Sequence, residues 1–215
     1  MARITVIGGT GYAGSAIVEE AASRGHEVTA FSRALPAEPV HGVKYVRGDA
    51  NEEEALSSVV LGADVVVGAL APRDSLAATY RDVYRTIARL ADAQGVPLFI
   101  VGGFSALRPA PGAPRFVEDP NHGPSPLRAQ IEAVSALVID DLPAAAETLD
   151  WVFVSPAQKF GALAPGERLG SYRVGDDVAL RPDDGGAISG PDFALGFVDL
   201  IEKASHHRVH LNLAY

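Results

Sequence analysis

The feature that most constrains this chain is a glycine-rich turn between a β-branched run and a helical one. Residues 3–7 read Arg-Ile-Thr-Val-Ile, which is typical of a buried strand, and residues 15–22 have the composition of a helix. No spacer separates the turn from either segment. Its glycines fit both G-x-G-x-x-G and G-x-x-G-x-x-G, and they are Gly8, Gly9, Gly11 and Gly14.

A turn of this kind between strand and helix predicts a dinucleotide site. One glycine permits the tight bend, another lets the backbone approach a pyrophosphate, and the third lets the helix pack against the strand. The helix then offers unpaired N–H groups and the positive end of its dipole to the phosphates. The cofactor contacts predicted here are Gly8, Thr10, Gly11, Tyr12, Ala13 and Gly14.

The end of the second predicted strand, residues 27–31, indicates which coenzyme is preferred. An NAD site carries an acidic residue about 20 residues beyond the glycines, which holds the ribose 2′-hydroxyl. Here Phe31 is followed by Ser32 and Arg33. An arginine can pair with a 2′-phosphate and a serine can donate a hydrogen bond to it, so we expect NADP(H) to be preferred over NAD(H). A solvated loop arginine is the alternative.

Further apolar runs over residues 43–46, 64–67, 98–101 and 150–154 alternate with helical segments. This alternation predicts an α/β fold of Rossmann type, with a doubly wound, mostly parallel sheet and helices on both faces. Ligands of such sheets bind outside the carboxyl ends of the strands. The further cofactor contacts predicted at these ends are Asp49, Ala50, Ala69, Leu70, Ala71, Gly102, Gly103, Pro156 and Gln158. Asp49 could equally cap the helix predicted over residues 51–61.

Two residues at the strand ends are candidates for catalysis. Ser105 follows the fifth strand, although it could simply bond its own backbone, and Lys159 follows the sixth, although a lone loop lysine is usually solvated. The proline-rich loop over residues 105–126 is predicted to wall the substrate side. His122 could titrate in this loop, but an exposed, inert histidine is the default expectation.

The C-terminal part changes pattern. Two short alternating runs, 171–174 and 178–180, suggest a β-hairpin within an insertion over residues 161–190. A helix over residues 191–203 and a last strand over 208–213 follow, so we expect one Rossmann domain over residues 1–215 with a small hairpin and helix appendage.

Composition excludes several function classes. The net charge of −9 argues against nucleic-acid binding, and the absence of cysteine excludes disulfides and thiol chemistry. No apolar stretch is long enough to span a bilayer and no signal peptide is evident, so we expect a cytoplasmic protein without a membrane partner. The histidines at positions 206, 207 and 210 lack a metal-ligand spacing, so no metal site is expected and surface positions are the default. A monomer or a homodimer is expected.

The chain resembles the atypical short-chain dehydrogenases/reductases. The glycine turn, the Phe31-Ser32-Arg33 and Gly48-Asp49 segments, Gly102-Gly103 and the C-terminal stretches carry the resemblance, for example residues 150–156 and 165–168. More narrowly, it is similar to the NAD(P)H-binding family of candidate NADH-flavin reductases related to biliverdin reductase B and the NmrA-like proteins. The resemblance implies a serine at the end of the fifth strand, which Ser105 matches, whereas the histidine that some relatives carry after Pro156 has no counterpart.

The function that we predict depends on where this chain differs from ordinary members of the wider superfamily. No tyrosine is followed by a lysine four positions later, so a carbonyl reductase working through a Tyr-x-x-x-Lys pair is disfavoured. Hydride transfer from NADPH to a loosely bound flavin (FMN or FAD) or quinone-like acceptor needs mainly proximity, and it fits this chain. The alternative is a non-catalytic NADP(H)-sensing regulatory protein. A weaker third option is an epimerase- or dehydratase-like enzyme, for which no acid/base pair is found.

Overall fold

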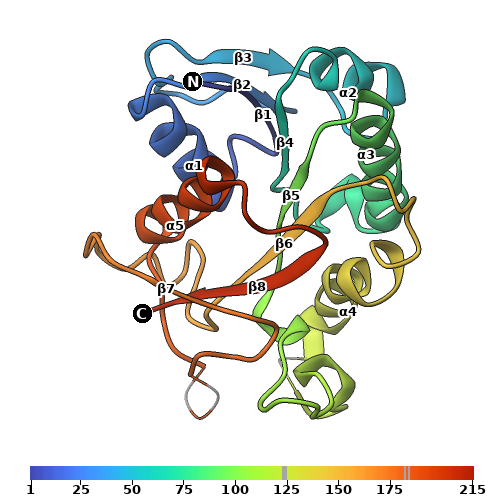
Figure 1. Ribbon diagram of the computed structural model, residues 1–215, viewed down its shortest axis with the longest axis vertical. Coiled ribbons are helices and arrows are strands. Elements are labelled where there is room, and N and C mark those ends of the chain that lie inside the picture. Colours follow the sequence, from blue (N-terminus) through green and yellow to red (C-terminus); the bar gives the residue numbers. More distant parts are fainter. Residues whose placement is uncertain (123–124, 182, 184) are drawn as a thin grey trace.

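One mostly parallel sheet runs through the molecule, as the ribbon of the computed structural model shows (Figure 1). The structure describes residues 1–122, 125–181, 183 and 185–215. Within these residues, eight strands are ordered β3-β2-β1-β4-β5-β6-β8-β7, and the β7–β8 pair is antiparallel while the others are parallel. The strands are β1 (Arg3–Ile7), β2 (Glu27–Ser32), β3 (Lys44–Arg47), β4 (Val65–Gly68), β5 (Leu98–Val101), β6 (Trp151–Pro156), β7 (Arg173–Gly175) and β8 (Val209–Ala214).

Helices cover both faces of this sheet. In Figure 1, α1 and α5 lie together on one face, and α2, α3 and α4 lie on the other. The predicted Rossmann-type fold is therefore confirmed. The helices are α1 (Tyr12–Ser23), α2 (Glu53–Val60), α3 (Tyr80–Gln94), α4 (Arg128–Ala136), which continues into the π-helical turn η5 (Leu137–Asp141), and α5 (Gly190–Lys203). Short 3₁₀ turns are η1 (Asp74–Leu76), η2 (Phe104–Ala106), η3 (Phe116–Glu118) and η4 (Ser125–Leu127).

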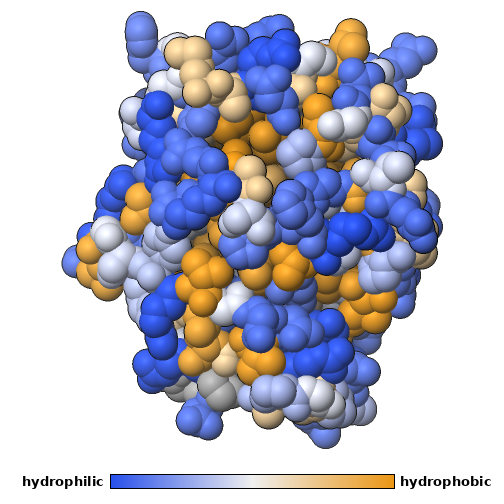
Figure 2. Space-filling view, in the orientation of Figure 1, coloured by the Kyte–Doolittle hydropathy of each residue, from blue (hydrophilic) through white to orange (hydrophobic). Residues whose placement is uncertain are grey.

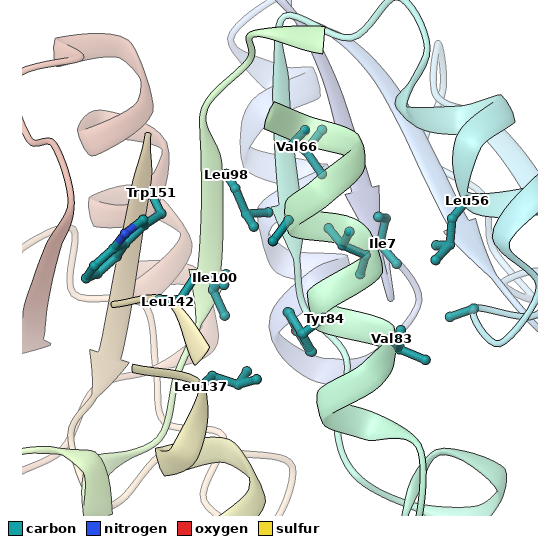
Figure 3. Close-up of a cluster of buried hydrophobic side chains, with 14 of the residues drawn as sticks. Ile7, Leu56, Val66, Val83, Tyr84, Leu98, Ile100, Leu137, Leu142 and Trp151 are labelled. Atoms are coloured by element: carbon teal, nitrogen blue, oxygen red, sulfur yellow. The ribbon is translucent and has the colours of Figure 1, made fainter. Parts of the chain in front are cut away.

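The period-two pattern of the strands divides the hydrophobic core between the two faces. In β6, Trp151 and Phe153 pack on the α2–α3 side, whereas Val152 and Val154 pack on the α1–α5 side. All four side chains are buried, as expected for a strand covered on both faces. Figure 3 shows the first of these clusters, in which Tyr84 of α3 lies among the aliphatic side chains. Tyr84 is therefore a core residue.

The C-terminal antiparallel pair exists, but its partners differ from the predicted hairpin. Val174 of β7 pairs with Leu213 of β8, rather than with residues 178–180. Val178 instead forms an isolated parallel bridge with Arg108. Because β6 occupies only one edge of β8, the other edge is free to accept β7, and turn signals alone could not reveal that edge. Residues 123, 124, 182 and 184, which belong to the loop and insertion predicted over 105–126 and 161–190, lie outside the described residues.

Hydrophilic residues cover most of the face drawn in Figure 2, and hydrophobic residues appear there as separate patches. Among the helices of the described residues, none is both long enough and apolar enough to cross a membrane.

Candidate functional site

The glycine turn between β1 and α1 is packed so closely that side chains are excluded from it. A Cβ atom on Gly14 would lie 2.1 Å from the carbonyl oxygen of Gly8. Gly8 itself has a φ of +90°, and a Cβ there would lie 2.5 Å from the carbonyl oxygen of Ala69. The amide of Ala69 donates to Ile7 O at 2.8 Å, so the turn lies directly beside the end of β4. Backbone alone therefore forms this surface, as a pyrophosphate cradle requires.

The start of α1 completes the cradle. Gly11 is the N-cap, and it has no side chain to accept the free amides of the first turn, which belong to Tyr12, Ala13 and Gly14. Within α1, which the structure describes in full, the first turn contains no acidic residue that would repel a phosphate. The predicted turn residues thus form one continuous anion-compatible surface, and they fit a dinucleotide.

The end of β2 is tied to this turn and carries positive charge. Thr10 N–H donates to Ser32 Oγ at 3.1 Å, and the Ser32 hydroxyl donates to Phe31 O at 2.7 Å. The exposed Arg33 guanidinium donates to Ser75 Oγ at 3.0 Å and pairs with Asp74 at 3.2 Å. Arg47 of β3 donates to Arg33 O at 3.1 Å, so a second guanidinium lies at this corner of the sheet.

Asp49 and Ala50 follow β3 at the same edge. The carboxylate of Asp49 accepts both the backbone N–H and the side-chain amide of Asn51, each at 2.9 Å. Helix α2 has Glu52 as its N-cap, so Asp49 forms a local turn with Asn51 and does not cap that helix. Ala50 is buried against the core.

Hydrogen bonds hold the ends of β4, β5 and β6 in place. Leu70 N–H donates to the hydroxyl of Tyr84 at 3.2 Å, which fixes the Ala69–Ala71 segment against α3. Gly102 N–H donates to Val154 O at 2.8 Å, and Ser155 Oγ donates to Gly103 O at 2.8 Å. The predicted residues of these three strand ends therefore lie at one edge of the sheet.

Ser105 lies in η2 and forms a pair with His122. The Ser105 Oγ and His122 Nε2 atoms are 3.0 Å apart. The imidazole stacks on Phe116, with ring centroids 5.1 Å apart, and Phe116 stacks on Phe104 at 4.8 Å. The expectation that His122 is exposed is wrong, because its side chain is partly buried. This burial lowers the pKa of the imidazole below its usual value, while Asp119 raises it and Arg128 lowers it to lesser degrees.

Pro156, Gln158 and Lys159 are placed differently from one another. Pro156 is buried in β6, whereas the side chains of Gln158 and Lys159 are exposed. Their backbone amides donate to Gly185 O at 2.8 Å and Gly186 O at 3.1 Å.

The chain after β6 also approaches the glycine turn. Phe160 contacts the ring of Tyr12 edge-on, with centroids 5.2 Å apart, and the Tyr12 hydroxyl donates to Pro165 O at 2.9 Å. Lys159 thus lies on a segment that contacts the first residue of α1 and that is separate from the segment carrying Ser105 and His122.

The sequence did not predict a buried polar network that lies beside the end of β6. His210 was expected at the surface, but it is only 7% exposed, because its position on β8 faces inward beside β6. Its Nε2 lies 2.8 Å from Ser155 Oγ and its Nδ1 lies 3.2 Å from a guanidinium nitrogen of Arg115. Burial, reinforced by the charge of Arg115, lowers the pKa of His210 to about 3.

The network anchors the loop that carries the Ser105–His122 pair. Arg115 and Arg108 both pair with Asp177, at 3.1 Å and 3.0 Å. The sequence offered two signals for this network: Arg115 stands between prolines, and His210 stands within an apolar strand. Neither signal identifies the residue's partner.

The sheet order and the glycine turn between β1 and α1 define this protein as a Rossmann-type, NAD(P)-binding α/β protein. Within that class, the chain belongs to the NAD(P)H-binding family, whose sequence model matches residues 8–204. The resemblance stated from the sequence is thereby confirmed.

Relatives cover nearly the whole chain. The uncharacterized protein YwnB of Bacillus subtilis is 30% identical over 207 residues, 95% of this chain and 94% of YwnB. A candidate epimerase from Bacteroides thetaiotaomicron has a TM-score of 0.86 and 30% identity, covering 100% of this chain and 97% of its own. A candidate NADH-flavin reductase from Streptococcus pneumoniae has a TM-score of 0.85 and 27% identity, covering 100% and 99% of the two chains.

Proposed function

We propose that this protein is an NADPH-dependent reductase that transfers hydride to a loosely bound flavin or quinone-like acceptor. The observation that carries the proposal is the side-chain-free cradle of Gly8 and Gly14, which lies at the same sheet edge as the ends of β4, β5 and β6. A nicotinamide coenzyme bound there supplies the hydride. The resemblance to a candidate NADH-flavin reductase supports the class of acceptor.

The chain's own residues have three tasks in this proposal. The turn and the first amides of α1 bind the pyrophosphate, and Arg33 together with Arg47 attracts a 2′-phosphate, which gives the preference for NADP(H). Gly102, Gly103 and Ala69 let the nicotinamide approach the sheet edge. Ser105 orients the acceptor, and Gln158 or Lys159 contacts the carboxamide or the acceptor. Because a reduced flavin can take its proton from water, this transfer requires mainly proximity.

The test is NADPH oxidation by the purified protein, followed by absorbance with and without added FMN, alongside calorimetric binding of NADPH. We expect saturable, protein-dependent oxidation that requires FMN and is faster with NADPH than with NADH. Tight NADPH binding without turnover on FMN or on a benzoquinone would overturn the reductase proposal and favour the NADP(H)-sensing alternative.

A further inference from the structure

Ser105 and His122 share a geometry that the proposed flavin reduction does not use. Their Oγ and Nε2 atoms are 3.0 Å apart, although the two residues are 17 positions apart in the chain. Flavin reduction needs no protein acid, because the flavin can exchange its proton with water. A serine hydroxyl that hydrogen bonds to an imidazole is, however, a proton-transfer pair.

The loop holds this pair in place with specific contacts. Arg128 of α4 donates to the carbonyl oxygens of Val117 at 2.7 Å and Asp119 at 2.8 Å, and a longer contact of 3.4 Å reaches that of His122. The stacking of the imidazole on Phe116 fixes its plane. The pair is therefore built by side chains from η2, η3 and α4 rather than by a chance contact in a loose loop.

We propose that Ser105 and His122 form a proton relay that lets this protein interconvert a carbonyl compound and its alcohol, in place of the missing Tyr-x-x-x-Lys pair. Ser105, at the end of β5, is the residue that touches the substrate oxygen, and His122 acts through Ser105. This inference rests on the proposed coenzyme site, and it adds a second class of acceptor to the proposed function.

The step balances in both directions. In reduction, the carbonyl carbon gains a hydride from the reduced nicotinamide. The carbonyl oxygen gains a proton from Ser105 Oγ, which is replaced by the proton of the His122 imidazolium, so the products are the alcohol and the oxidised nicotinamide. In oxidation, the carbinol carbon gives a hydride to the oxidised nicotinamide and the hydroxyl proton passes to Ser105 Oγ, while neutral His122 accepts the proton that Ser105 gives up.

The relay predicts a dependence on pH. The charged groups that act on His122 are Asp119, which favours its protonated form, and Arg128, which disfavours it, while burial has the largest effect and lowers its pKa. At pH 7 the imidazole is therefore mostly neutral. Reduction should slow as pH rises above the pKa of His122, and oxidation should speed up until His122 is fully neutral.

The first test needs no coenzyme. The imidazole ¹⁵N shifts of His122 are followed by NMR from pH 5 to 8 in the free protein and in Ser105→Ala, with His122→Gln to assign the signal. If Ser105 donates to Nε2, the proton of the neutral ring lies on Nδ1. Losing that donor should then shift the tautomer toward Nε2–H and raise the pKa of His122. Unchanged imidazole ¹⁵N shifts of His122 in Ser105→Ala would show that the two side chains do not form a hydrogen bond, and this would overturn the proposed relay.

The second test compares acceptors, using NADPH with benzaldehyde or FMN, and NADP⁺ with benzyl alcohol. We expect Ser105→Ala and His122→Gln to slow benzaldehyde reduction about 100-fold, the lower end for general acid catalysis, and to flatten its pH profile. In His122→Gln, FMN reduction should change less than about threefold, and exposed His41→Gln, in the loop before β3, should change neither reaction.

The outcomes separate the two proposals. FMN turnover without benzaldehyde turnover would overturn the relay and leave the flavin reductase intact. Benzaldehyde turnover without FMN turnover would support the relay and overturn the flavin reductase. Equal losses with both acceptors in His122→Gln would also overturn the relay, because they would reveal a structural role.

Discussion

Ser155 and His210 fix each other's hydrogen-bonding roles on neighbouring strands. The Ser155 hydroxyl donates its proton to Gly103 O, so the contact of 2.8 Å to His210 requires that Nε2–H be the donor. Arg115 can only donate, so Nδ1 of His210 must accept from it. The network therefore needs a neutral imidazole, and a second proton would point Nδ1–H at a guanidinium.

This requirement predicts a loss of stability in acid. The pKa of His210 is about 3 in the folded protein, below the unfolded value. Between these two values the unfolded chain binds a proton that the folded chain does not, so the free energy of unfolding falls as pH is lowered. Taking an unfolded pKa of about 6.5, the loss at pH 5 is roughly 2 kcal/mol.

Urea unfolding at pH 7 and pH 5 measures this effect. His210→Gln removes the titrating group. We therefore expect the difference between its free energies of unfolding at pH 7 and pH 5 to be smaller than that of the wild type by about 2 kcal/mol. The exposed His41→Gln is the matched control and should behave as the wild type does. Identical pH dependence in His210→Gln and the wild type would contradict the role of His210.

The glycine turn gives a prediction whose sign opposes helix propensity. Alanine normally stabilises a helix relative to glycine by about 1 kcal/mol. In Gly14→Ala, however, the new Cβ would meet Gly8 O at 2.1 Å, so we expect the free energy of unfolding to fall by about 3 kcal/mol.

Gly11→Ala is the matched control for this substitution. Gly11 has a φ of −75°, which alanine adopts, and its Cβ would lie 3.4 Å from the same oxygen. It should remain within about 1 kcal/mol of the wild type in urea unfolding. Equal free energies of unfolding for Gly11→Ala and Gly14→Ala would show that the turn accommodates a Cβ atom at position 14 without strain.

Arg24 is predicted to be the main electrostatic link between α1 and α5. Its guanidinium pairs with Glu20 at 2.9 Å, Asp199 at 2.7 Å and Glu202 at 2.6 Å, and Glu20 is buried. Arg24→Met leaves these carboxylates close together with less compensation, so unfolding should become easier by about 2–3 kcal/mol.

A surface pair provides the comparison for Arg24. Arg89 pairs with Glu53 at 2.6 Å, but both side chains are more than half exposed. Arg89→Met should therefore cost less than about 1 kcal/mol in the same urea unfolding experiment. Similar losses in the two variants would mean that burial does not strengthen the Arg24 cluster.

The parts of the fold that the sequence predicted are those that depend on local patterns. The apolar run Val65–Val67 is buried on both faces as predicted, and the glycines between β1 and α1 form the tight turn that their spacing indicates. Both features follow from residues adjacent in the chain, so no knowledge of distant segments was needed.

The parts that sequence reasoning missed depend on contacts between distant segments. Arg115 reaches His210 across 95 residues, and the hydroxyl of Ser105 meets His122 across 17. Nothing near His210 in the chain distinguishes an inward-facing histidine from a surface one. The choice of β8 as the partner of β7 likewise depends on which sheet edge is open, and turn residues carry no information about that edge.

Arg33 provides the sharpest test of coenzyme preference. Replacing it with alanine removes a cation from the corner where a 2′-phosphate is expected, so NADPH binding should weaken by about 1.5–3 kcal/mol, the usual contribution of a charged hydrogen bond. NADH lacks that phosphate, and its binding should be unchanged. Calorimetric titration of both coenzymes measures the difference, and equal losses for the two would contradict the assignment.

Asp74→Asn is the matched variant, because Asp74 is the carboxylate that now pairs with Arg33 at 3.2 Å. A 2′-phosphate would have to compete with this carboxylate for the guanidinium, and the two anions would repel each other. Asp74 has a φ of +51°, which asparagine tolerates well, so the backbone should be unaffected. The Arg33 side chain is 48% exposed and that of Asp74 is 75% exposed, so water screens their interaction. We therefore expect NADPH to bind only a few times more tightly to Asp74→Asn. If the affinity for NADPH falls in Arg33→Ala and rises in Asp74→Asn while the affinity for NADH stays unchanged in both, the residues at the end of β2 recognise the 2′-phosphate.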